Sequence, residues 1–280
     1  MFRTASFLLY SLIVLVLSSV AARAQELNTA LMNGTFEIAG PSAKAEGKTT
    51  FGTVFFLGKP LKADPQKGSY VLITATHVLD EISGDTATLV LRKKDATGAL
   101  SKFPYTISIR QNGTKLYVTN PDADVAAMFV HLPTDTEIKL LPIAFLADDA
   151  RLEHLEVHPG DELLCLGFPL AADVNGFPVV RSGLLASYPI TPSKTVKQYY
   201  YNFHTFPGNS GGPVYFNFLN RVYGNATHLG DVQQGIIGLV TQQVTSQLPE
   251  FKDAPLDIAI VVPSSYIQDT IAMLPEEPSN

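Results

Sequence analysis

The stretch Pro207-Gly208-Asn209-Ser210-Gly211-Gly212-Pro213-Val214 decides which fold this 280-residue sequence predicts. Ser210 stands among glycines, which adopt backbone conformations that other residues resist. Taken alone, the stretch is typical of a turn between two strands. It also fits a nucleophilic serine, which requires a base to take its proton and a third group to orient that base.

Both partners of such a serine occur upstream. Thr74-Ala75-Thr76-His77-Val78 places a histidine just after an apolar run, and Asp122-Ala123-Asp124-Val125-Ala126 places a carboxylate before another one. The chain order is therefore His, Asp, Ser. The nucleophile elbow of α/β-hydrolases has the order serine, acid, histidine. No acid stands between Ser210 and His228, the only later histidine, so chain order excludes that alternative.

These three blocks resemble the chymotrypsin-like serine proteases in their order and spacing. The stretches 160–169, 180–184 and 257–263 look like strands of bacterial heat-shock serine proteases, although we expect no peptide-binding PDZ module here. The resemblance implies an all-β fold of two six-stranded antiparallel barrels with a short C-terminal helix. It also implies a serine endopeptidase that acts on polypeptides through an acyl-enzyme, with His77, Asp124 and Ser210 as its triad.

Further roles follow from the same resemblance. The backbone N–H groups of Gly208 and Ser210 would form the oxyanion hole. Asp122 competes with Asp124 for the orienting role, because the two lie on one side of a strand, but the Asp-Val-Ala match favours Asp124. Trypsin-type zymogens have an aspartate before the nucleophile to pair with a newly cut N-terminus. Asn209 has no charge for that pairing, so we expect activity without such activation.

The resemblance places a substrate-binding pocket six residues before the nucleophile and along the strand that ends at residue 243. Its predicted lining residues are His204, Thr205, Thr241, Gln242 and Gln243. Because trypsins have an aspartate at the place of His204, a preference for Lys or Arg is not expected. An acidic side chain or a small, apolar one would suit the pocket equally, and His204 is equally well interpreted as a packed strand residue.

The N-terminus has the charged, apolar and small-residue regions of a secretory signal peptide, which predicts cleavage near Ala24 and a secreted or periplasmic protein. A retained membrane anchor is the weaker alternative, and no later segment suits a bilayer. The expected organisation is a signal peptide (1–24), an N-terminal extension (25–47), a first β-barrel (48–135), a linker (136–150), and a second β-barrel with the helix (151–280). A serine could cap that helix near residue 264.

Composition excludes several other classes. A net charge of −6 gives no affinity for nucleic acid. The single cysteine, Cys165, excludes an internal disulfide, and its apolar surroundings indicate a buried, inert thiol. His154 and His158 stand four apart, but no glutamate directly follows His154 as the His-Glu-x-x-His metal motif requires, and we expect neither metal nor cofactor. Two rival functions remain open: a non-catalytic peptide-binding module on the same fold, and a serine esterase.

Overall fold

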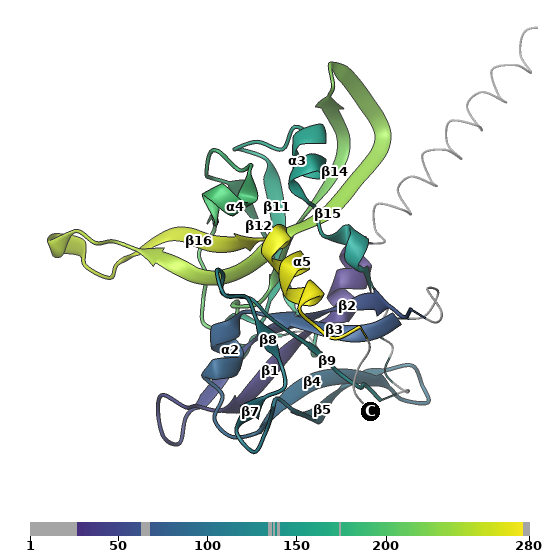
Figure 1. Cartoon of the computed structure of the whole chain (residues 1–280), viewed down its shortest axis with the longest axis vertical. Coiled ribbons are helices and arrows are strands. Elements are labelled where there is room, and N and C mark those ends of the chain that lie inside the picture. The colour runs from purple at the N-terminus through teal and green to yellow at the C-terminus, as the bar shows by residue number, and fades with distance from the viewer. Residues whose placement is uncertain are drawn as a thin grey trace, which may run out of the picture.

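The computed structural model describes residues 27–62, 68–133, 136, 138, 141–173 and 175–276. The predicted signal peptide, residues 1–24, lies outside them. Within the described ranges, no helix is both long enough and apolar enough to cross a membrane. Two β-structures lie one above the other in Figure 1, and the chain passes from the first to the second near residue 145.

The first half of the chain forms an eight-stranded sheet. Its hydrogen-bonded order is β5-β4-β1-β2-β3-β9-β8, and β10 pairs with β2. Along β2 a run of seven buried residues, 52–58, faces core on both sides. The strands are β1 (Thr35–Pro41), β2 (Thr49–Pro60), β3 (Gly68–Thr74), β4 (Thr86–Lys94), β5 (Leu100–Ser108), β8 (Val118–Thr119), β9 (Ala126–Phe129) and β10 (Leu141–Pro142), with a separate hairpin of β6 (Arg110–Gln111) and β7 (Thr114–Lys115).

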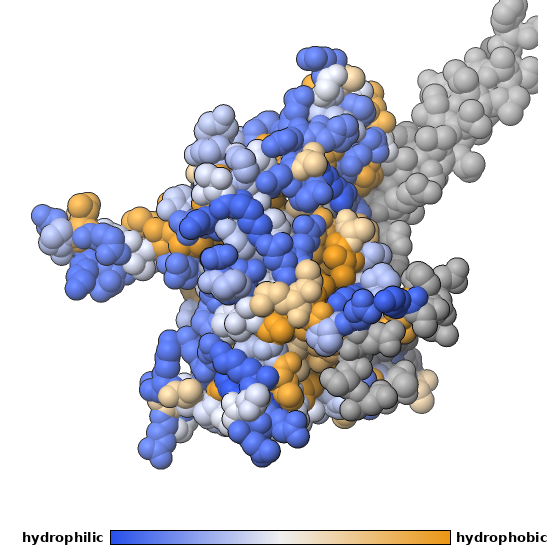
Figure 2. Space-filling model, in the orientation of Figure 1, coloured by the Kyte–Doolittle hydropathy of each residue, from blue (hydrophilic) through white to orange (hydrophobic). Residues whose placement is uncertain are grey.

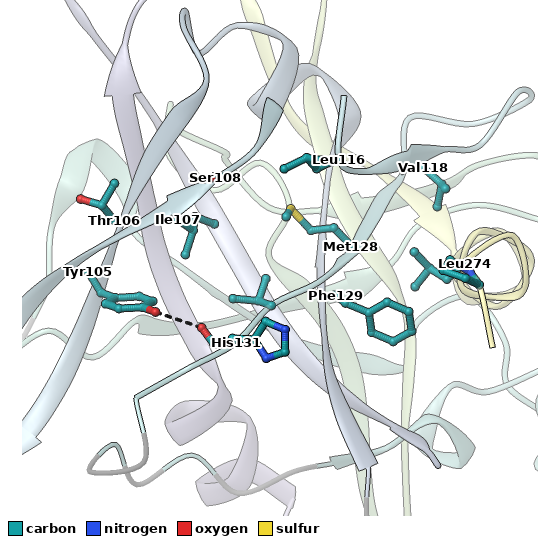
Figure 3. A pocket seen from close by; sticks show the side chains of 12 residues that line it. Tyr105, Thr106, Ile107, Ser108, Leu116, Val118, Met128, Phe129, His131 and Leu274 are labelled. Carbon is teal, nitrogen blue, oxygen red and sulfur yellow. Dashed lines mark hydrogen bonds between the residues drawn. The ribbon is translucent and has the colours of Figure 1, made fainter. Parts of the chain in front are cut away.

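This sheet differs from the expected six-stranded barrel, because its pairing ends at β5 and β8 in the described chain. Pro104 in β5 has no N–H to donate, and prolines within sheets occur on edge strands. Between β5 and β9 lies a hollow of about 450 Å³, lined mostly by apolar side chains (Figure 3). Tyr105 is one of the lining residues, and its hydroxyl donates to the carbonyl of His131 over 3.2 Å.

The second half forms a closed barrel with the strand order β11-β12-β13-β16-β15-β14. Alternation is clear in β13, where Tyr199 and Tyr201 are buried while the residues between and after them are exposed. The six strands are β11 (Glu162–Gly167), β12 (Val179–Leu185), β13 (Tyr199–Asn202), β14 (Pro213–Tyr223), β15 (Ala226–Thr245) and β16 (Pro255–Pro263).

Short helices occupy the connections. They are α2 (Thr76–Asp80), α3 (Asp149–His154), α4 (Ser193–Val196), α5 (Ser264–Ala272) and the 3-10 turns η1 (Ile143–Phe145), η2 (Pro169–Ala171) and η3 (Pro249–Phe251), while residues 27–34 are also helical. Helix α5 follows the second barrel, but its buried side chains Tyr266, Ile267 and Ile271 belong to the core of the first sheet. The helix therefore ties the two halves together.

Two hairpins project from the second barrel (Figure 1). The long β14–β15 hairpin exposes Leu219, Val222 and Leu229. The other, between β15 and β16, exposes Leu248 and Phe251, and apolar patches interrupt its polar surface at the left of Figure 2.

The all-β prediction and the short C-terminal helix are confirmed, with two differences in detail. Strand β1 lies within the predicted N-terminal extension and pairs with both β2 and β4. The predicted serine cap of α5 is wrong, because Pro263 occupies the cap position. The Ser264 hydroxyl instead donates to the carbonyl of Ala147, which satisfies it in the core.

Candidate active site

His77 and Asp124 meet because two neighbouring strands end and begin at the same level of the first sheet. Thr74, the last residue of β3, pairs with Ala126, the first residue of β9. His77 lies three residues after Thr74, in the short helix α2, and Asp124 lies two residues before Ala126. Antiparallel register therefore brings together two residues that are 47 positions apart.

Asp124 holds His77 at two points. One carboxylate oxygen lies 2.6 Å from Nδ1 of the imidazole, and the other accepts the backbone N–H of His77 at 3.0 Å. Each side chain is about one third exposed. Burial acts to lower the pKa of His77, but the hydrogen bond and charge of Asp124, together with the charge of Glu81, raise that pKa above its ordinary value of 6.5. Asp122, the competing carboxylate, is exposed and does not reach His77.

Ser210 lies in the nucleophile loop, residues 207–212, which leads into β14. The N–H of Asn209 donates to the carbonyl of Phe206, and Gly208 has φ +99°, as a turn with positive φ at its third residue requires. A Cβ atom at Gly208 would lie 2.1 Å from the Phe168 carbonyl. Only glycine fits there.

The nucleophile loop packs against the strand that leads to His77. Gly211 has φ +86°, and a Cβ atom there would lie 2.2 Å from the Thr74 hydroxyl and 3.1 Å from the Ala75 nitrogen. Ser210 and His77 therefore stand beside the same end of β3. The structure describes no hydrogen bond between them, since the Ser210 hydroxyl donates to the carbonyl of Thr241 over 2.9 Å.

Two peptide groups of the nucleophile loop have their carbonyls held by backbone N–H donors. The Pro207 carbonyl accepts from Leu170 N–H at 2.7 Å, and the Asn209 carbonyl accepts from Gly212 N–H at 2.9 Å. In a trans peptide the N–H points opposite to the carbonyl. The N–H groups of Gly208 and Ser210 consequently face away from these partners, and neither has an acceptor among the described residues.

Asn209 is buried, 2% exposed, and its side-chain oxygen has no hydrogen-bond partner within the described ranges. No charged group of the described chain pairs with it. The expectation that no inserted N-terminus is needed stays a prediction.

Two of the predicted substrate-binding residues, Thr205 and Gln243, contact each other. The Gln243 side-chain oxygen accepts the backbone N–H of Thr205 at 2.7 Å and the hydroxyl of Thr205 at 2.8 Å. Thr241 presents its carbonyl to Ser210, as described above. Gln242, between them, is exposed.

His204 has partners that the sequence did not suggest. Its Nδ1 atom pairs with the carboxylate of Asp257, and its ring lies 4.4 Å from that of Phe206. Arg181 donates to the His204 carbonyl at 2.9 Å and stacks over Phe203. Asp257 lies in β16 and Arg181 lies in β12, so their contacts with His204 become visible only once the strands of the barrel are paired.

The remaining candidates lie outside this site. Cys165 is buried as predicted, and burial raises the pKa of its thiol to about 12. His154 ends α3 and packs edge-on against Tyr223, while His158 lies near Asp161. Among the described residues, no three histidine, cysteine or acidic side chains cluster as a metal would require.

No family model matches the chain, and no curated protein matches it. Solved structures similar to it include three with identities of 12–15%. The Rv3671c protease from M. tuberculosis is 15% identical, with a TM-score of 0.48 over 90% of this chain and 85% of its own. The thermostable serine protease AL20, from an extremophilic microorganism, is 12% identical, with a TM-score of 0.46 over 85% and 95%.

The third structure, the protease Anisep from Arthrobacter nicotinovorans, is 15% identical, with a TM-score of 0.48 over 86% of this chain and 94% of its own. All three are described as proteases, and AL20 is described as a serine protease.

Proposed function

We propose that the protein is an exported serine endopeptidase with His77, Asp124 and Ser210 as its catalytic residues. The observation that carries this proposal is the two-point contact of Asp124 with His77 beside the nucleophile loop. A hydrogen bond from Nδ1–H to the carboxylate leaves Nε2 of the imidazole unprotonated, so that it can accept a proton. Export rests on the signal peptide, and sequencing of the exported chain should find Gln25 first.

In the proposed reaction, Ser210 Oγ attacks the carbonyl carbon of the scissile bond while its proton passes to Nε2 of His77. The carbonyl oxygen becomes an oxyanion, which the N–H groups of Gly208 and Ser210 face. The C–N bond then breaks, and the leaving amine takes the proton from His77. A water molecule then reacts in the same way: His77 takes a proton from the water while the water oxygen attacks the acyl carbon. The bond from the acyl carbon to Ser210 Oγ breaks, and Ser210 Oγ takes the proton back from His77.

The Ser210 hydroxyl must first turn from the Thr241 carbonyl towards His77. Such a turn is a single χ1 rotation, which partly exposed side chains make within nanoseconds. Catalytic hydrogen bonds are often absent or long before substrate binds. The bond to Thr241 is therefore compatible with the proposed role of Ser210.

For the substrate residue that precedes the cleaved bond, we propose a small, uncharged side chain. Gln243 reaches across to Thr205, so its side chain occupies the space between β15 and the segment that carries Thr205. His204 is paired with Asp257, whose carboxylate would repel an acidic substrate side chain. Both contacts disfavour the acidic alternative, and the first also disfavours large apolar residues.

A fluorophosphonate probe tests the proposal, because it reacts with an activated serine and not with an ordinary one. Residues 25–280 should be labelled and should cleave peptides, while Ser210→Ala should do neither. Ser182→Ala removes an exposed serine of β12 and should behave as the wild type. Absence of labelling in the wild type would indicate a binding module, and labelling with hydrolysis of esters alone would indicate an esterase.

A further inference from the structure

Thr53 belongs to β2 of the first sheet, yet its polar groups contact the nucleophile loop of the second barrel. The side chain is completely buried. Its hydroxyl donates to the Gly208 carbonyl at 2.6 Å, and its backbone N–H donates to the Ser210 carbonyl at 2.8 Å. The same hydroxyl oxygen accepts the N–H of Phe168 at 3.2 Å, so both of its roles are satisfied.

With these bonds, every carbonyl group from residue 207 to residue 210 has a donor. Leu170 and Gly212 hold the first and third carbonyls, and Thr53 holds the second and fourth. A peptide group cannot rotate while its carbonyl is held, because rotation would break that bond in a buried place, at a cost of about 1–3 kcal/mol for each unpaired group. The N–H group of Gly208 shares a peptide group with the Pro207 carbonyl, and the N–H group of Ser210 shares one with the Asn209 carbonyl. The bonds that hold these carbonyls therefore set the orientation of the two N–H groups.

Thr53 is itself fixed in place. Its carbonyl accepts the hydroxyl of Thr74, the last residue of β3, at 2.7 Å. The same carbonyl would lie 2.1 Å from a Cβ atom at Gly211. Thr53 therefore connects the strand that leads to His77 with the loop that carries Ser210. Phe168, which donates to it, directly precedes the turn that holds Pro207.

We propose that Thr53 is a positioning residue: its hydroxyl fixes the Gly208–Asn209 peptide, so that the nucleophile loop presents two N–H groups to a developing oxyanion. This inference rests on the proposed protease function. Thr53 acts through the loop and does not touch the substrate. The first sheet thereby contributes to the oxyanion site of the second barrel as well as supplying the base.

Replacement of Thr53 by valine tests the role, because valine keeps the shape and removes the hydroxyl. For Thr53→Val we expect kcat per active site to fall on the order of 100-fold, as for a misplaced catalytic group, with KM little changed. The inhibition constant of a peptide boronic acid, whose tetrahedral adduct places an oxygen at the oxyanion site, should rise in parallel. Thr53→Ser restores the hydroxyl and should recover most of kcat.

Thr35→Val is the matched control. Thr35 is also a completely buried threonine of the first sheet, but its hydroxyl has no partner among the described residues, so this change should leave kcat as in the wild type. Active sites are counted by titration with the fluorophosphonate probe, which separates lost activity from lost folded protein. If Thr53→Val does not fold, Thr53→Cys replaces it, and its kcat should lie below that of Thr53→Ser.

The outcomes separate the two proposals. A wild type that takes no probe and cleaves no peptide overturns the protease function and the positioning role together. An active wild type overturns the positioning role alone in three cases: if Thr53→Val keeps its kcat, if Thr53→Ser loses as much as Thr53→Val, or if KM changes while the boronic acid binds as before.

Discussion

The two halves of the candidate site are assembled in different ways. His77 and Asp124 lie just beyond the ends of two neighbouring strands of one sheet, and a single register, Thr74 opposite Ala126, brings them together. Ser210 depends on contacts between the two halves of the chain: Thr53, 157 positions before it by number, and Leu170 hold its loop. The position of His77 thus depends on the pairing of two strands, whereas the position of the nucleophile loop depends on packing between the two halves of the chain.

This difference indicates where each half is vulnerable. Changes to His77 or Asp124 should alter proton transfer and leave the nucleophile loop as it is. Changes to the loop should alter stabilisation of the oxyanion and leave the pKa of His77 as it is. Variants of each half test this separation.

Asp124→Asn should have the largest effect. The amide oxygen can still accept the His77 backbone N–H, but the amide nitrogen then faces Nδ1 and places the imidazole proton on Nε2. That tautomer cannot accept a proton from Ser210, and we expect kcat to fall about 10,000-fold. Steady-state kinetics with a chromogenic peptide measures this. Asp122→Asn changes an exposed carboxylate two residues away and should remain active; equal losses in the two variants would contradict the assignment of Asp124.

Gly208→Ala should damage the nucleophile half instead. Its Cβ atom would lie 2.1 Å from the Phe168 carbonyl, so the loop must move. A displaced oxyanion donor costs about 100- to 1,000-fold in kcat. Gly84→Ala is the control for backbone strain, because Gly84 also has positive φ but has no atom within 4 Å of an added Cβ. If the pH profile of the residual activity moves with Gly208→Ala, the two halves are not separable.

The same separation explains how much the sequence predicts. The triad candidates stand in contiguous motifs, so their residue types and order are visible without a structure. Strand β11, Glu162–Gly167, lies within the stretch 160–169 that resembles a strand, because its apolar run is bounded by Asp161 and Pro169. Strand β14 contains Tyr215, Phe216 and Phe218, aromatic residues typical of strands, but the glycine-rich motif directly before it is typical of a turn, so the two signals conflict at its start.

The contacts that hold the nucleophile loop could not be predicted in this way. Thr53 resembles any other threonine of a β-strand, and the partner of its hydroxyl is Gly208, 155 residues away. Asp257 likewise stands in an apolar strand run and gives no sign that it pairs with His204. The open edge of the first sheet had one signal, Pro104, which is unusual inside a closed sheet. Long-range pairing of polar groups depends on packing that periodicity does not encode.

Gln243→Ala should change selectivity more than rate. Removal of the side chain that reaches Thr205 opens space beside the loop, and peptides with a large apolar residue before the cleaved bond should gain about tenfold in kcat/KM relative to those with alanine, as one or two buried methylenes contribute. Profiling with a peptide library measures the ratio. Gln247→Ala changes an exposed glutamine of the hairpin between β15 and β16 and should leave the ratio unaltered. A loss of kcat on every peptide would show that Gln243 supports the loop instead.

The smallest effect concerns the pKa of His77, on which only the base half should depend. Asp124 and Glu81 raise this pKa, while Lys44, which pairs with Glu81 at 2.6 Å, lowers it. Since His77 must be neutral to accept a proton, kcat/KM should rise with pH through the raised pKa. Glu81→Gln removes a negative charge, which should move that rise to lower pH; Lys44→Gln should move it to higher pH. Both groups reach solvent, so salt should weaken both shifts. Shifts of the same sign in the two variants would contradict this electrostatic account.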